Sequence, residues 1–317
     1  MSNVPPSILT PRMAALLERI HRAKRPAFHT LSPRDARIAY LMGAEILDLP
    51  RASLPRVEDI VIPGPAGALA ARLYAPAARD AGPLPVTLYC HGGGFTIGGL
   101  ETHDSLCRQL ALRSGVALIS LDYRLAPEAR FPAAVDDAWA AMRWLAEYGD
   151  TLGLDGTRLA VAGDSAGGTL AATSALHARD IGLTLALQLL ITPGTTALAD
   201  TTSHARFARG YLLDAESIAW FFANYIDAAD RHDWRFAPLE AEDHTGLAPA
   251  CFVLAEADPL VDEGVEYADR LRAAGVAVDL EIFRGVTHDF IKLGRAIPEA
   301  LTALDFCGDA LRKALLP

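Results

Sequence analysis

Short apolar runs that alternate with helix-like segments are the feature that most constrains the fold of this chain. From residue 57 onward, the central apolar runs are continuous rather than alternating, as in parallel strands covered on both faces. Strands separated by helices through short connections predict an α/β fold, with a mostly parallel central sheet of about eight strands flanked by helices. The expected strands are residues 59–62, 69–74, 86–90, 116–121, 159–162, 185–191, 250–255 and 278–283, and a final helix is expected over 297–315.

Additional helices are expected before the first strand and inside a long insertion. Thr10-Pro11 and Ser32-Pro33 each place an N-cap residue before a proline at the first helical position. No strand is expected between residues 193 and 249, and a segment of this length inside a compact domain usually has a structure or function of its own. We interpret it as part of a helical cap; a peripheral decoration with its own small core is the alternative. The expected organisation is N-terminal cap helices in 1–52, the first part of the core in 53–193, a cap insertion in 194–248 and the second part of the core in 249–317.

Composition and charge exclude several classes of protein. The 317 residues are 51% hydrophobic, which is enough for one large core, and the net charge of −10 argues against a nucleic-acid partner. Residues 1–7 lack the basic and apolar regions of a secretory signal, and no apolar run reaches the length of a membrane span. The four cysteines show no CxxC spacing, so that neither a zinc site nor a disulfide framework is expected. A cytoplasmic protein is the resulting expectation.

The segment Gly-Asp-Ser-Ala-Gly fits the G-x-S-x-G pattern of a nucleophile elbow. In that turn the chain passes sharply from a strand into a helix, and side chains two residues before and after the serine would collide, so both positions need glycine. An apolar run precedes the segment and an Ala- and Leu-rich run follows it. An ordinary tight turn is the alternative, but this context favours a nucleophilic serine. The motif residues are Gly163, Asp164, Ser165, Ala166 and Gly167.

A serine hydroxyl needs an adjacent general base, and His288 is the best placed of the nine histidines. It follows the last expected strand, at the carboxyl edge of the sheet where active sites of α/β proteins gather. The third member should be a carboxylate after the preceding strand. Asp258 is favoured because a proline fixes a turn directly after it, and Glu256 is the main competitor. Asp262 and Glu263 are interpreted as acids that the helix dipole favours in the first turn of the next helix.

A glycine-rich loop supplies the expected oxyanion hole. His91, Gly92, Gly93 and Gly94 follow the apolar run 86–90, where an H-G-G-G loop is expected. Consecutive glycines allow backbone N–H groups to converge on one oxygen with no side chain in the way. A phosphate-binding loop is the rival interpretation, but no Lys-Ser/Thr pair follows and the spacing does not match GxGxxG.

Taken together, these segments resemble the hormone-sensitive-lipase-like group of α/β-hydrolases, the bacterial family IV esterases. The matching segments are Tyr-Cys-His-Gly-Gly-Gly-Phe at 89–95, Gly-Asp-Ser-Ala-Gly-Gly at 163–168 and Asp-Pro-Leu-Val-Asp-Glu-Gly at 258–264, with further similarity at 122–128 and 131–134. The resemblance runs from about residue 56 to the C-terminus and implies the α/β-hydrolase fold with a helical cap.

The resemblance also implies a role for each site residue. Ser165 would be the nucleophile, His288 the general base and Asp258 the carboxylate that orients the base. The backbone N–H groups of Gly93, Gly94 and Ala166 would donate to the oxyanion. The chain departs from the family pattern at Asp289, where glycine is frequent, at Gly98-Gly99, where Gly-Ser is common, and at Thr192, where an aromatic residue is common and whose small side chain would enlarge the pocket.

The implied activity is a carboxylesterase that hydrolyses short-chain acyl esters through an acyl-enzyme, with no metal or cofactor. A lipase, deacetylase, lactonase or peptidase could use the same triad. A non-catalytic small-molecule receptor is the rival from another class; retention of His288 argues against it. The resemblance further implies a homodimer that pairs through the edge strand at 278–283.

Overall fold

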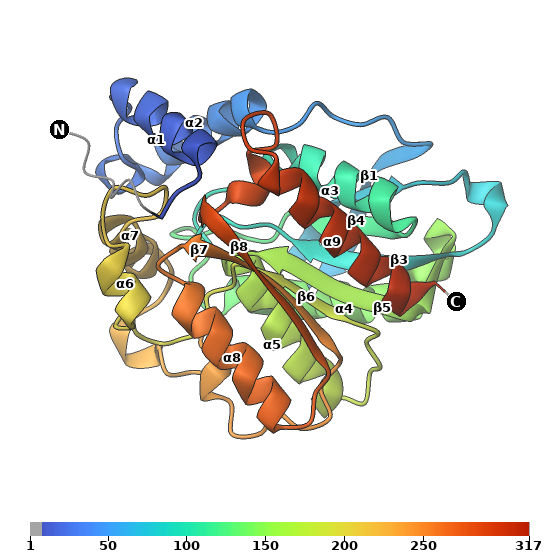
Figure 1. Ribbon diagram of the computed structural model, residues 1–317. Helices are drawn as coiled ribbons and strands as arrows, with labels where there is room; N and C mark the ends of the chain where they lie inside the picture. The colour runs from blue at the N-terminus through green and yellow to red at the C-terminus, as the bar shows by residue number, and fades with distance from the viewer. Residues whose placement is uncertain (1–7, 317) are drawn as a thin grey trace.

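The computed structural model describes residues 8–316, so that residues 1–7, on which the expectation about a secretory signal rests, lie outside the described part. The described chain forms one eight-stranded sheet in the order β1-β2-β4-β3-β5-β6-β7-β8, with β8 at an edge (Figure 1). Strand β2 pairs antiparallel with both of its neighbours, and the strands from β4 to β8 are parallel. The strands are β1 (Arg56–Gly64), β2 (Gly67–Ala75), β3 (Leu84–Cys90), β4 (Ala117–Leu121), β5 (Leu154–Asp164), β6 (Gln188–Ile191), β7 (Ala250–Ala257) and β8 (Val278–Thr287).

Helices cover both faces of the sheet, which explains why the central strands are apolar along their whole length. One face packs against α4 (Ala133–Tyr148), α5 (Ala166–Asp180) and α8 (Val261–Ala273). The other packs against α3 (Leu100–Ser114) and α9 (Glu299–Leu315), whose buried Leu304 and Leu311 lie on the expected stripe. All eight expected strands are present, and the expected fold is confirmed.

Two segments distant in sequence lie side by side over the carboxyl edge of the sheet. They are the N-terminal helices α1 (Pro11–Arg22) and α2 (Pro33–Leu47), and the insertion that contains α6 (Thr202–Arg206) and α7 (Ala215–Tyr225) (Figure 1). The hydroxyls of Thr10 and Ser32 accept hydrogen bonds from Met13 N and Asp35 N, so both residues are N-caps as expected.

Apolar side chains join the two cap segments to each other and to the sheet. Ala36 of α2 shares a small buried cluster with Ile218 and Phe221 of α7. Tyr225, at the end of α7, stacks on Phe95 with ring centroids 4.0 Å apart, and Phe95 follows β3. The insertion therefore contacts the main core through Tyr225 and also shares the small cluster with α2.

Two further observations concern the chemistry of the chain. The four cysteines are buried and unpaired. Within residues 8–316, no helix combines the length and the apolar character that crossing a membrane requires.

Candidate active site

Ser165 occupies a strained turn between β5 and α5. Its backbone dihedral angles are φ 53° and ψ −122°, in the left-handed half of the map that side chains avoid. A Cβ atom on Gly163 would overlap the carbonyl oxygen of Gly167, and one on Gly167 would overlap the carbonyl oxygen of Cys90. The two glycines are therefore required by close backbone approach, as the sequence pattern indicated.

Ser165, His288 and Asp258 form a chain of hydrogen bonds. The Nε2 atom of His288 lies 3.0 Å from Ser165 Oγ, and its Nδ1 atom lies 2.7 Å from Asp258 Oδ2. Asp258 follows β7 and also accepts a hydrogen bond from Leu260 N. Strand β8 runs to Thr287, beyond the end at residue 283 that the sequence predicted, so His288 lies directly at the strand end.

The environment of His288 favours its protonated form. Burial alone would lower the pKa of His288, but the Asp258 carboxylate and its hydrogen bond outweigh burial. With smaller contributions from Asp289 and Asp164, they raise the pKa of His288 to about 9. The site therefore stabilises the imidazolium, which is the charge that develops when a histidine takes a proton from serine.

The competing residues are engaged elsewhere. Glu256 accepts hydrogen bonds from Arg284 Nη1 and Gly285 N, each at 2.8 Å, and Asp258 is the carboxylate that bonds His288. His177 stacks on Trp139, with ring centroids 4.0 Å apart. Of the other histidines, His244 bonds to Pro238 O, His204 to Thr201 and His103 to Asp164.

The glycine loop after β3 brings free N–H groups to the serine. Gly93 and Gly94 have φ values of 119° and 56°, which glycine adopts without strain. Within residues 8–316, no hydrogen-bond acceptor is present for the N–H groups of Gly93, Gly94 or Ala166, and all three residues line the cavity that contains Ser165. Ala166 is the first residue of α5, where the helix leaves its N–H groups unpaired.

A buried polar cluster fixes this loop. Asp164 Oδ1 accepts hydrogen bonds from Tyr89 OH at 2.6 Å and Gly92 N at 3.0 Å, and Asp164 Oδ2 lies 3.1 Å from His103 Nε2. Burial opposes ionisation of Asp164, but His103, Lys292 and the Tyr89 hydrogen bond outweigh burial and hold the pKa of Asp164 below its usual range. The sequence placed Asp164 in the motif but gave no sign of its partnership with His103.

His91 contributes packing to the same loop. Its ring stacks on Tyr123, with centroids 4.2 Å apart, and its Nδ1 atom lies 2.8 Å from Gly92 O. Burial, assisted by the neighbouring His103, lowers the pKa of His91 to about 3, so that the ring is neutral. His91 is therefore suited to shaping the loop rather than to proton transfer.

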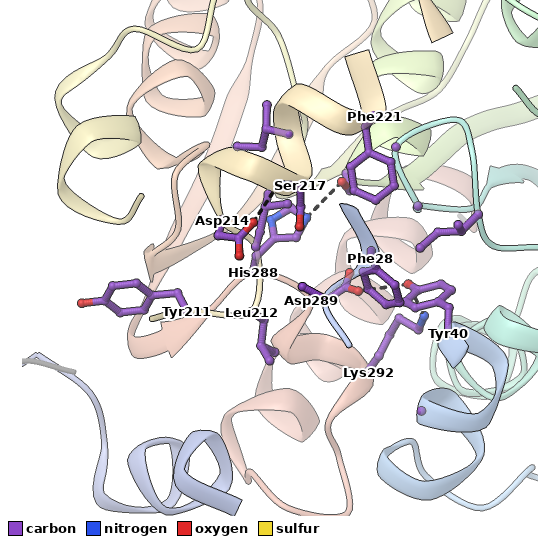
Figure 2. A pocket seen from close by; sticks show the side chains of 18 of the residues that line it. Phe28, Tyr40, Tyr211, Leu212, Asp214, Ser217, Phe221, His288, Asp289 and Lys292 are labelled. Atoms are coloured by element: carbon purple, nitrogen blue, oxygen red, sulfur yellow. Dashed lines mark hydrogen bonds between the residues drawn. The ribbon is translucent and has the colours of Figure 1, made fainter. Parts of the chain in front are cut away.

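The serine opens into a cavity of about 840 Å³ beneath the cap. Phe28, Leu212 and Phe221 supply apolar surface to its walls. The charged side chains of Asp289 and Lys292 line the same cavity as His288 (Figure 2). Thr192 is buried and does not itself line this cavity, and enlargement of the pocket by threonine in place of an aromatic residue stays a prediction.

Among the described residues, one cluster of three side chains has the residue types and spacing of metal ligands. Potential ligand atoms of His29, Asp214 and Glu216 lie within 4.8 Å of one another, and Asp214 also lines the cavity. Asp214 already accepts a hydrogen bond from Ser217 N as the N-cap of α7, and Glu216 lies 3.6 Å from Arg209. These carboxylates have partners in the protein, and we assign no metal to them.

Comparison with known proteins places this site in a family. The family described as "alpha/beta hydrolase fold" matches residues 87–292. The chain is 40% identical to ethyl acetate hydrolase of Pseudomonas putida, over 97% of this chain and 99% of that protein, and 43% identical to esterase LipI of Mycobacterium tuberculosis, over 84% and 86%. A crystal structure of a thermostable esterase from Pseudomonas putida superposes with a TM-score of 0.95 at 35% identity, covering 99% of this chain and all of that one.

The chain therefore belongs to the α/β-hydrolase fold family. Within it, the prediction of a hormone-sensitive-lipase-like ester hydrolase is confirmed, because the relatives that match nearly the whole chain are esterases.

Proposed function

We propose that this protein is a carboxylesterase that hydrolyses short-chain acyl esters with Ser165 as its nucleophile. The observation that carries the proposal is the hydrogen-bonded chain from Ser165 Oγ through His288 to Asp258, with unpaired N–H groups beside the serine. Ester hydrolysis needs a nucleophile, a proton carrier and donors for the oxyanion, and this arrangement offers each of them.

The proposed reaction proceeds in two stages. His288 Nε2 accepts the proton of Ser165 as its oxygen attacks the ester carbonyl, and the N–H groups of Gly93, Gly94 and Ala166 bind the oxyanion. His288 then donates that proton to the leaving alcohol, and water releases the acid from the acyl-enzyme by the same steps. Since the base must be neutral to accept a proton and its pKa is raised to about 9, the competent fraction grows as the pH approaches that value.

Short acyl chains are proposed because the cap lies over the site. Helices α2 and α7 lie over the glycine loop and leave a cavity of about 840 Å³ that is partly open to solvent, rather than a flat interfacial surface. The similarity to an ethyl acetate hydrolase supports the same substrate range. Lipase, deacetylase and lactonase activities use the same triad and differ only in the substrate that enters.

The proposal is tested with a series of p-nitrophenyl esters from acetate to dodecanoate. We expect kcat/KM to be highest for the shortest chains, and Ser165→Ala to reduce the hydrolysis of p-nitrophenyl acetate by about 10³-fold or more. Ser174→Ala, on the following helix and remote from His288, is the matched control and should retain the activity. Equal rates for wild type and Ser165→Ala would contradict the nucleophile, a preference for long chains would favour a lipase, and no hydrolysis of any ester would favour a receptor.

A further inference from the structure

Three polar side chains form a hydrogen-bonded group on the cavity wall beside His288. Lys292 Nζ donates to the hydroxyl of Tyr40 at 2.7 Å, and that hydroxyl donates to Asp289 Oδ2 at 3.0 Å (Figure 2). Asp289 and Lys292 come from the segment that follows β8, whereas Tyr40 comes from α2 of the cap. All three residues line the cavity that contains Ser165.

This group retains hydrogen-bonding capacity that the protein does not use. Lys292 is only 4% exposed, its ammonium group lies 4.2 Å from the centroid of the Tyr40 ring, and within residues 8–316 it forms no salt bridge with a carboxylate. Two of its three N–H donors and the Oδ1 atom of Asp289 have no partner among residues 8–316. Burial of a charged donor without full pairing is costly, so the free positions beside the cavity indicate a ligand group that completes them.

The position of these three side chains, next to His288, indicates that they would contact the alcohol portion of an ester substrate. In the proposed reaction the leaving oxygen receives its proton from His288 Nε2, so the alcohol must lie on the His288 side of Ser165. Asp289 is adjacent to His288 in the chain, and Lys292 follows it within one helical turn. The acyl side faces different residues, because Thr169, Gly194 and Thr196 line the same cavity from α5 and the loop after β6.

The charges of Lys292 and Asp289 favour an uncharged ligand group that can both donate and accept a hydrogen bond. A carboxylate on the substrate would be attracted by Lys292 but repelled by Asp289 and by the nearby Asp48. An ammonium group would be repelled by Lys292. A hydroxyl group can accept from Lys292 Nζ and donate to Asp289 Oδ1 at the same time, which satisfies both residues.

We infer that Lys292 and Asp289, held by Tyr40, form a subsite for a hydroxyl group on the alcohol portion of the substrate. The inference rests on the proposed ester hydrolysis and names its substrate class: acyl esters of short diols or polyols, in preference to esters of alkanols of the same length. Asp289 and Lys292 thereby become specificity-determining residues, and Tyr40 a positioning residue.

The test compares 2-hydroxyethyl acetate with propyl acetate, which differ by a hydroxyl in place of a methyl group. The quantity measured is the ratio of their kcat/KM values, followed by acid release. We expect the wild type to prefer the hydroxyethyl ester, and Lys292→Met to reduce the ratio by about tenfold or more, since hydrogen bonds to charged groups are among the stronger ones. Lys313→Met, at an exposed position of α9, is the matched control and should leave the ratio unchanged.

A second variant, Asp289→Gly, tests the subsite independently in case Lys292→Met does not fold. Asp289 has φ 63°, a conformation that favours glycine, so Asp289→Gly should fold and should also lower the ratio. Any shift in the pKa of His288 caused by loss of the Asp289 charge acts on both esters and cancels in the ratio. Ratios equal to the wild-type value in both variants would overturn the subsite while leaving the esterase intact. If the wild type hydrolysed neither ester, the proposed function would fail together with the subsite.

Discussion

Glu263 combines a position that its local sequence favours with contacts to a distant segment of the chain. It lies in the first turn of α8, as the sequence indicated, but it is 2% exposed. Its Oε1 atom accepts from Thr195 N at 2.6 Å, and its Oε2 atom lies 2.9 Å from Thr196 Oγ1. Glu263 is therefore a first-turn acid, as predicted, but it is also buried, because its side chain crosses to the loop after β6.

The surroundings of Glu263 favour a neutral carboxyl group. Burial, partly opposed by the Thr195 and Thr196 hydrogen bonds, raises the pKa of Glu263 to about 8. Thr196 Oγ1 is also 2.9 Å from the carbonyl oxygen of Leu198, which can only accept. If the single Thr196 hydrogen is donated to Leu198, the Glu263 carboxyl must supply the other hydrogen and so be protonated.

Replacement of Glu263 by glutamine should remove a pH dependence of stability. In the wild type, the unfolded chain loses this proton near its usual pKa of 4.5 and the folded chain near 8, so stability falls as the pH rises between these values. The full difference is on the order of 5 kcal/mol. Urea unfolding at pH 4, 6 and 9 should show Glu263→Gln losing less stability than wild type. The exposed Glu266→Gln on the same helix should follow the wild type, and parallel curves for wild type and Glu263→Gln would contradict a neutral Glu263.

Helix α7 contacts the glycine loop that follows β3. Phe221 of α7 packs so closely on Gly94 that a Cβ atom there would overlap its ring. The cap helix and the loop that carries the N–H donors are therefore fitted to each other. Arg37 of α2 adds a second link, since it donates to Thr96 O and Ala126 O at 2.8 Å.

Gly94→Ala should reduce kcat more than alanine does at another glycine that also has a positive φ. The added Cβ would displace either Phe221 or the N–H donors, and loss of one oxyanion donor typically costs about 10²–10³ in kcat. Gly182→Ala is the matched control, because Gly182 also has a positive φ, 73°, but no atom within 4 Å of the added Cβ. Steady-state kinetics with p-nitrophenyl acetate should show a large loss only for Gly94→Ala, and partial recovery in Gly94→Ala/Phe221→Ala. Equal kcat values for the two alanine variants would show that the contact has no role.

In the whole molecule, the features predicted correctly from the sequence are those that a local pattern of residues determines. Continuous apolar runs identified the strands, and Asp258 and His288 were predicted from their places after successive strands, which meet at one edge of a parallel sheet. Contacts between segments that are distant in the sequence were not predictable, because no pattern in the sequence indicates which of their residues meet. Tyr40 and Lys292 are 252 positions apart, and His103 meets Asp164 only because α3 packs on a face of the sheet.

The most direct test of the account is covalent trapping of the nucleophile. A p-nitrophenyl alkylphosphonate reacts at phosphorus with an activated serine and releases p-nitrophenolate, leaving a stable adduct. We predict one adduct per chain in the intact mass of the wild type, located on Ser165 by peptide mapping, slower labelling of His288→Ala and none of Ser165→Ala. Labelling of Ser165→Ala at the wild-type rate, or an adduct at another residue, would contradict the assignment of Ser165 as the nucleophile.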